Sequence, residues 1–235
     1  MDGRRGRRRI ELMKIAMSFL LVAVFAGVGL GQERFVKPVD EAGRDASFLE
    51  FRTKLIEAAE RKDTAFILGI LDPKINLSFG GDAGIADFKR IWKVNSKNSQ
   101  FWDEFLTVIK NGGTWWKDKS VGKVFYAPYT FDSFPQDLDS FIHEVIFGSN
   151  VNLRESPSAD SRVVAQLSYN IVTVETDPDT DAGKVRETRG WSKVKTLGGL
   201  EGWVKNELVR SPIDYRAGFE KKRGVWKMVA FIAGD

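Results

Sequence analysis

Two stretches in the second half of the chain decide its fold: GSNVNLRESPSADSRVVAQLSYNIVTV at residues 148–174 and GWSKVKTLGGLEGWVKNELV at residues 190–209. Apolar and polar residues alternate in both, so that Val151 and Leu153 fall on one face of a first short strand. In the second stretch, Gly198–Gly199 favours a tight hairpin turn, because glycine accepts the positive φ angles that such a turn needs. Short strands at regular spacing, joined by glycine turns, predict a small β-barrel.

This pattern resembles a bacterial SH3 (SH3b-type) domain over residues 148–210. The matching residues, in chain order, are Val151-Asn152-Leu153-Arg154, Pro157, Val163-Val164, Leu167, Gly190-Trp191, Val194, Gly202-Trp203-Val204 and Leu208. Family members usually carry a glycine shortly after the position of Leu167, where this chain has Ser168-Tyr169-Asn170. Asn170 can adopt the left-handed conformation that a glycine would take there.

The resemblance implies a non-enzymatic binding module that works outside the cytoplasm on peptide or peptidoglycan-related cell-wall ligands. Its candidate ligand-binding residues are Trp191, Trp203 and Tyr169. Strand parity places the two Trp side chains opposite Val194 and Val204, so we expect them on a half-exposed face where a flat ring can receive a peptide or a sugar. The alternative is that each Trp belongs to the barrel core or covers its end, since Trp is highly buried on average.

The region before the barrel shows a helical pattern instead. Four short helices are expected from the apolar spacing, at Phe48–Ala59, Phe66–Leu71, Ile85–Trp92 and Phe101–Ile109. Asp63 and Ser99 can cap the second and the fourth of them. Alternation at Ile75–Phe79 and the run Val124–Tyr126 suggest strands. The aromatic residues of 88–116 are expected in the core. Trp115 and Trp116 are the exception, because successive side chains on a strand point to opposite faces and the two cannot both face inward.

The whole chain is therefore expected to be α+β, with a helix-rich N-terminal domain, a small SH3-like β-barrel and a C-terminal β-hairpin. The expected boundaries are a signal peptide at 1–31, a linker at 32–45, the helix-rich α+β domain at 46–143, the SH3-like (SH3b) domain at 144–210 and the hairpin at 211–235. The hairpin either packs on the N-terminal domain, which makes the SH3-like unit an insertion, or extends the sheet of the barrel. With Ala127-Pro128-Tyr129 and the tail Trp226-Lys227-Met228…Ala233-Gly234-Asp235, this order is similar to a group of secreted bacterial SH3 domain-containing proteins of unknown function.

Residues 1–31 have the pattern of a secretory signal peptide. Five arginines and a lysine precede the uncharged apolar run Ile15–Leu30, and we expect cleavage at Gly31–Gln32, with Met1 or Met13 as the start. The run is shorter than the roughly 20 residues that span a bilayer, and an uncleaved membrane anchor is the alternative. Either way the rest of the chain is expected in the periplasm or outside the cell.

The net charge of +4 belongs to the same segment. Residues 1–31 carry six basic and two acidic residues, whereas the rest of the chain carries 30 of each. The rest is neutral, so the sequence indicates no nucleic-acid partner.

Motifs for a cofactor, metal or catalytic site are weak. Cysteine is absent and His143 is the one histidine, which excludes thiolate and His-rich metal sites. Asp177–Asp181 opens like a calcium loop, but Ala182 stands where glycine is needed and Thr188 where the bidentate glutamate is needed. No metal and no cofactor are expected.

No catalytic residues are expected either. No G-x-S-x-G motif accompanies His143, which is interpreted as structural, and the carboxylates of Asp137, Asp139 and Glu144 are interpreted as solvated. The rival hypothesis is a small-ligand binder or enzyme, in which the N-terminal region and the tail hairpin form a cone of helices on a curved sheet. A deep pocket holding a carboxylate would favour that rival, and a filled aromatic core would favour the binding protein.

Overall fold

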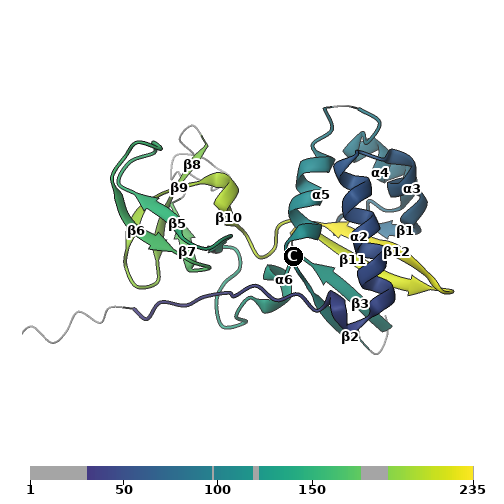
Figure 1. Cartoon of the computed structure of the whole chain (residues 1–235), viewed down its shortest axis with the longest axis horizontal. Helices are drawn as coiled ribbons and strands as arrows, with labels where there is room; N and C mark the ends of the chain where they lie inside the picture. The colour runs from purple at the N-terminus through teal and green to yellow at the C-terminus, as the bar shows by residue number, and fades with distance from the viewer. Residues whose placement is uncertain (1–30, 97, 119–121, 176–189, 235) are drawn as a thin grey trace, which may run out of the picture. The chain divides into compact units, whose positions relative to one another are not determined.

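The computed structural model describes residues 31–96, 98–118, 122–175 and 190–234 (Figure 1). Residues 1–30 of the expected signal peptide and the Asp177–Asp181 loop lie outside these ranges. Residues 33–235 form one compact unit. Among the described residues, no helix has the length and apolar character needed to cross a membrane.

The helices form where the apolar spacing predicted them. They are α2 (Ala46–Glu60), α3 (Thr64–Ile70), α4 (Gly84–Trp92) and α5 (Phe101–Lys110), with a 3-10 turn η1 (Ala42–Arg44) before them and a short α6 (Thr130–Ser133) after them. The carboxylate of Asp63 caps α3 by accepting the N–H of Phe66 at 2.9 Å, as expected. Ser99 lies one residue before the N-cap of α5, and its hydroxyl accepts the N–H of Phe101 at 3.2 Å.

A five-stranded sheet lies beside these helices. It contains β1 (Leu71–Asn76), β2 (Thr114–Asp118), β3 (Gly122–Ala127), β11 (Arg216–Lys222) and β12 (Val225–Ile232), in the order β1-β12-β11-β3-β2. The C-terminal hairpin β11–β12 thus pairs with strands of the N-terminal region, and the strands of the SH3-like region are inserted between β3 and β11. Of the two arrangements that the sequence left open, the structure has the insertion.

The first strand of this sheet begins earlier than expected. The alternation predicted a strand at Ile75–Phe79, whereas β1 starts at Leu71, which pairs in parallel with Met228. Pro73 lies inside β1, and it is tolerated because β1 is an edge strand and needs no second ladder of hydrogen bonds. Phe79 follows the strand and is 60% exposed.

Aromatic rings fill the space between the helices and the five-stranded sheet. The fully buried rings are Phe48, Phe88, Phe101, Trp102, Phe105, Phe125, Phe219 and Phe231. The ring of Phe48 on α2 lies 4.4 Å from Phe125 on β3 and 4.9 Å from Trp226 on β12. The interior that the rival cone would use for a pocket is occupied by these rings. As expected for neighbours on one strand, Trp115 packs against the core and Trp116 is 45% exposed.

A seven-stranded sheet forms the second part. Its strands are β4 (His143–Ile146), β5 (Val151–Arg154), β6 (Val163–Leu167), β7 (Ile171–Val174), β8 (Trp191–Thr196), β9 (Glu201–Lys205) and β10 (Val209–Arg210), in the order β10-β4-β7-β8-β9-β5-β6, with a 3-10 turn η2 (Asn206–Leu208) before β10. Val151 and Leu153 point into its core, as their alternation predicted. The turn at Gly198–Gly199 joins β8 to β9, and Gly199 has a φ of 93°.

The expected left-handed turn after Leu167 belongs to a different residue. Tyr169, not Asn170, has a positive φ of 60°. Asn170 is buried instead, and its side chain accepts the N–H of Ser168 at 2.7 Å and donates to Glu33 at 3.1 Å. The left-handed position therefore falls on Tyr169, one residue earlier than expected.

The segment predicted as a linker at 32–45 is attached along much of its length. The N–H of Ile171 donates to the carbonyl of Arg34 at 2.8 Å, and the N–H of Val36 donates to the carbonyl of Tyr169 at 2.9 Å. Val36 is only 2% exposed. The linker prediction is therefore wrong, because the polar groups that suggested it are bonded to residues far away in the chain.

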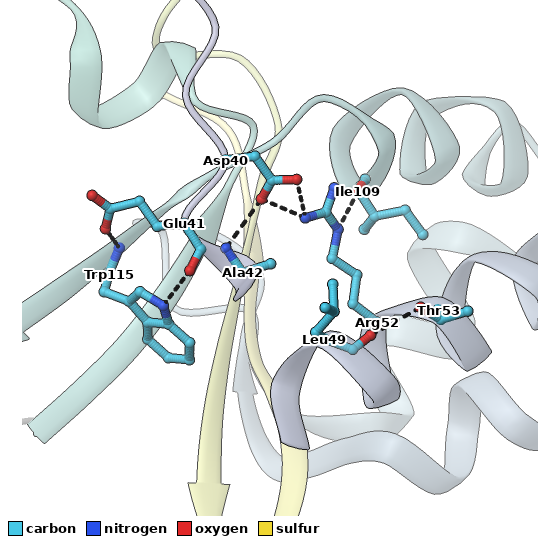
Figure 2. A network of polar contacts seen from close by, with 8 residues as sticks. All are labelled: Asp40, Glu41, Ala42, Leu49, Arg52, Thr53, Ile109 and Trp115. Carbon is cyan, nitrogen blue, oxygen red and sulfur yellow. Dashed lines mark hydrogen bonds and ion pairs between the residues drawn. The ribbon is translucent and has the colours of Figure 1, made fainter. Parts of the chain in front are cut away.

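The end of this segment is held by a polar network (Figure 2). Arg52 on α2 donates from Nη1 to both carboxylate oxygens of Asp40, at 2.6 and 2.8 Å, and from Nε to the carbonyl of Ile109 at 3.0 Å. The indole N–H of Trp115 donates to the carbonyl of Glu41 at 2.9 Å. These bonds tie the segment to α2 and to β2, and tie α2 to the end of α5.

Candidate functional site

The two tryptophans of the SH3-like domain lie on its outer face. In the antiparallel pair β8–β9, Lys193 is the cross-strand partner of Trp203, and Trp191 is the partner of Lys205. Val194 and the other alternate residues of β8 are buried, whereas both Trp side chains are only partly buried. Because side chains on one face of neighbouring strands meet directly or diagonally, Trp191, Lys193, Trp203 and Lys205 form one surface, which we call the Trp face.

The backbone under Trp203 is tightly held. Gly202 packs so closely on β5 that a Cβ atom there would lie 2.6 Å from the carbonyl oxygen of Arg154 and 2.8 Å from the side chain of Leu153. Arg154 is also the cross-strand partner of Trp203. Trp203 is therefore carried by a strand that is paired on both sides, so its ring is presented on a rigid support.

A hollow of about 300 Å³ adjoins the Trp face. Its lining residues are Thr173, Val174, Glu175, Lys193, Val194, Lys195 and Glu201. Lys193 pairs with Glu175 at 2.9 Å and Lys195 with Glu201 at 2.7 Å. The hydrogen bond from Lys195 lowers the pKa of the Glu201 carboxyl, which keeps it ionised. The hollow thus offers two cations and two carboxylates, a charge pattern that suits a ligand carrying both ammonium and carboxylate groups.

Tyr169, the third candidate residue, lies elsewhere. It lines a separate hollow of about 320 Å³ with Tyr129, Phe147 and other residues, and neither Trp191 nor Trp203 borders that hollow. The Tyr129 ring stacks on Phe147 at 5.9 Å, and burial raises the pKa of its phenol. The structure brings the two tryptophans together and leaves Tyr169 apart from them.

Two of the residues considered for catalysis, His143 and Asp137, have protein partners that hold their side chains. The ring nitrogen Nδ1 of His143 lies 2.9 Å from the backbone carbonyl of Asp139. Asp137 forms a two-bond ion pair with Arg34, which lowers the pKa of its carboxyl. Within the described ranges, no three His, Cys, Asp or Glu side chains are grouped so that they could hold a metal ion.

Glu144 is the one carboxylate of this group with a strongly shifted pKa. Burial, together with the nearby charge of Asp214, raises it to about 7. The sequence indicated a solvated carboxylate, and that interpretation is wrong for Glu144. No local pattern could have shown it, because the burial results from the placement of β4 in the sheet.

Trp92 packs against the core, as expected for the aromatic residues of this region, but part of its side chain reaches the surface. It is only partly buried and borders two adjoining hollows together with Tyr215. Its position in the helical repeat is that of a core residue, so the sequence carried no signal for its exposure.

Comparison with known proteins identifies one module. Residues 149–210 match the bacterial SH3 domain family, which confirms the resemblance seen in the sequence. No curated protein matches the chain significantly. A bacterial SH3 domain is a binding module, and members of this family commonly bind peptidoglycan or peptide ligands.

Proposed function

We propose that this protein is exported and non-catalytic, and that its SH3-like domain binds the stem peptides of peptidoglycan. The observation that carries the proposal is the position of Lys193, which belongs both to the Trp face and to the charged hollow. A ligand lying on Trp203 would reach the ion pairs of the hollow at the same time. Stem peptides are short and carry both carboxylates and amines, which match the lysines and the glutamates of the hollow.

The charge distribution supports aromatic contact as the main source of affinity. Beyond residue 31 the chain has equal numbers of basic and acidic residues, so long-range attraction contributes little. Flat rings on a rigid strand provide apolar area at a low entropic cost, and Trp is enriched among residues that dominate binding energies. The paired charges of the hollow would then contribute orientation and selectivity.

The non-catalytic part of the proposal is supported by the filled interior of the N-terminal region. The space between its helices and sheet holds packed rings, including Phe48, Phe125 and Trp226. The carboxylate with the most shifted pKa, Glu144, lies in β4 and is not among the residues that line the charged hollow.

The direct test is calorimetric titration of the exported chain, starting at Gln32, with a synthetic stem peptide. We expect saturable binding that is lost in the double variant Trp191→Ala, Trp203→Ala. The matched control is Trp116→Ala, which removes an exposed tryptophan on β2. Absence of saturable binding at millimolar peptide, or equal binding by the double variant, would contradict the proposal.

A further inference from the structure

A second aromatic surface lies in the N-terminal region, formed by elements that the SH3-like domain does not contain. Trp92 is the last residue of α4, and Tyr215 directly precedes β11. Between them lie Gln100 and Asp103, at the start of α5. Two adjoining hollows of about 350 and 390 Å³ share Trp92, Gln100 and Tyr215 in their linings. We call this surface the Trp92–Tyr215 groove.

The two rings of the groove are fixed from behind. Their centroids are 4.8 Å apart with the ring planes at 65°. Phe231 on β12, which is fully buried, lies 5.0 Å from Trp92 and stacks on Tyr215 at 5.1 Å. Phe101 contacts both Trp92 and Phe231, at 5.6 and 5.5 Å. Neither ring can withdraw into the core, so the surface is organised before a ligand arrives.

Polar groups with unused hydrogen-bonding capacity surround the rings. In the described part of the chain, no protein group is bonded to the indole N–H of Trp92, the hydroxyl of Tyr215 or the side chains of Gln100 and Asp103. Elsewhere in this region, the indole N–H groups of Trp115, Trp116 and Trp226 each donate to a protein oxygen.

The Tyr215 hydroxyl remains a neutral donor. Burial and the carboxylates of Glu104 and Asp214 raise the pKa of its phenol. Glu104, also in the lining, is held by Arg210 at 2.8 Å, so its charge is balanced within the protein. Asp103 adds a carboxylate to the lining of one hollow and Lys93 adds an ammonium group to the lining of the other, so their charges offset each other and favour neither strongly anionic nor strongly cationic ligands.

We propose that the Trp92–Tyr215 groove binds an oligosaccharide. A sugar ring has an apolar face of C–H groups, which suits the exposed faces of fixed aromatic rings, and an edge of hydroxyls that both donate and accept hydrogen bonds. The carboxylate of Asp103 accepts, the indole and phenol groups donate, and the amide of Gln100 does both. Two adjoining hollows on one surface fit a chain of linked sugars. The inference does not depend on the stem-peptide proposal, because none of these residues belongs to the SH3-like domain.

The test is calorimetric titration of the exported chain with chitotetraose and, separately, with cellotetraose. Binding of both indicates recognition of the sugar ring alone, whereas binding of chitotetraose only indicates recognition of its acetamido groups, as in the glycan of a cell wall. Either result supports the inference. Absence of saturable binding to both at millimolar concentration would overturn it.

Variants separate binding from folding. Asp103→Asn and Gln100→Ala change exposed side chains, and each should weaken oligosaccharide binding at least threefold while leaving the melting temperature nearly unchanged. Trp92→Phe keeps the packing against Phe231 and should weaken binding about tenfold, and Trp116→Ala should have no effect. Unchanged affinity in all three groove variants, or tighter binding of tetralysine than of either sugar with strong salt dependence, would refute the groove as an oligosaccharide site.

Discussion

Arg52 on α2 holds both carboxylate oxygens of Asp40 with Nη1, at 2.6 and 2.8 Å, and so fixes the segment that leads from the expected cleavage site into the fold (Figure 2). The Arg52 side chain is 10% exposed and the Asp40 side chain 50% exposed. Replacing Arg52 removes the bond to the Ile109 carbonyl as well, and leaves that carbonyl without its partner. We expect Arg52→Ala to lower the free energy of unfolding by about 2–3 kcal/mol, as measured by urea denaturation.

An exposed ion pair on the same helix provides the control. Lys54 and Glu50 are 2.6 Å apart, and their side chains are 62% and 70% exposed. Because such pairs contribute little, Lys54→Ala should cost at most about 0.5 kcal/mol. Equal losses of stability in Arg52→Ala and Lys54→Ala would show that the bonds between Arg52 and Asp40 do not stabilise the protein.

The pKa of Glu144, raised to about 7, predicts how stability depends on pH. The unfolded state has the ordinary carboxyl pKa, so between that value and 7 the folded protein binds more protons than the unfolded one. Stability should therefore fall as the pH rises from 5 to 8. Glu144→Gln should flatten this part of the profile and raise the urea midpoint at pH 8.

Glu50→Gln is the control. The hydrogen bond from Lys54 lowers the pKa of Glu50, so Glu50 cannot produce a fall in stability between pH 5 and 8. A profile that is unchanged in Glu144→Gln would contradict the assignment.

Two glycines with opposite surroundings test the close packing under the Trp face. A Cβ atom at Gly202 would lie 2.6 Å from the Arg154 carbonyl oxygen, and β5 and β9 would have to separate. We expect Gly202→Ala to destabilise the protein by about 2–3 kcal/mol, as other overpacked substitutions do. Gly69 lies inside α3 with no atom within 4 Å of the added Cβ. Gly69→Ala should stabilise by about 0.5–1 kcal/mol through helix propensity. Thermal melts of the two variants should move in opposite directions, and a neutral Gly202→Ala would mean that the strand spacing is not tight.

The parts of the fold that could be predicted from the sequence depend on short-range patterns. The β8–β9 hairpin follows from alternation and the two glycines at its turn, and α3 follows from its spacing and the Asp63 cap. Parallel pairing of Leu71 with Met228 could not be predicted, because it joins residues that are far apart in the sequence. The same applies to the bond between Arg52 and Ile109, which are 57 positions apart.

The candidate sites could likewise be predicted only where they depend on short-range patterns. Strand parity was enough to place Trp191 and Trp203 on an outer face, because the two strands are neighbours in sequence. It could not show that Tyr169 lies beside Tyr129, which the tertiary structure decides. Trp92 has the spacing of a core residue, but its contact with Tyr215, more than 100 residues later, could not be predicted.

The mature chain is predicted to begin at Gln32. The basic residues and the apolar run both end before it, and Glu33 already bonds to Asn170 in the folded protein. N-terminal sequencing of protein recovered from the periplasm or the medium should therefore read Gln-Glu-Arg-Phe, or be blocked if the new terminal glutamine cyclises. Recovery of the intact chain in the membrane fraction would favour the anchor instead.

The single variants Trp191→Ala and Trp203→Ala decide whether the Trp face binds a ligand or only covers the barrel. An exposed aromatic anchor typically contributes about 2 kcal/mol at a binding surface, so each variant should weaken binding of the stem peptide at least about tenfold. Because both side chains are only partly buried, the melting temperature should change little. Leu153→Ala is the opposite case, since Leu153 is fully buried in the core of the SH3-like domain and its truncation should cost about 2–5 kcal/mol of stability. A barrel that unfolds in both Trp variants, as it does in Leu153→Ala, would assign the tryptophans to the barrel's own packing and direct the search for the peptide site to the Tyr129–Tyr169 hollow.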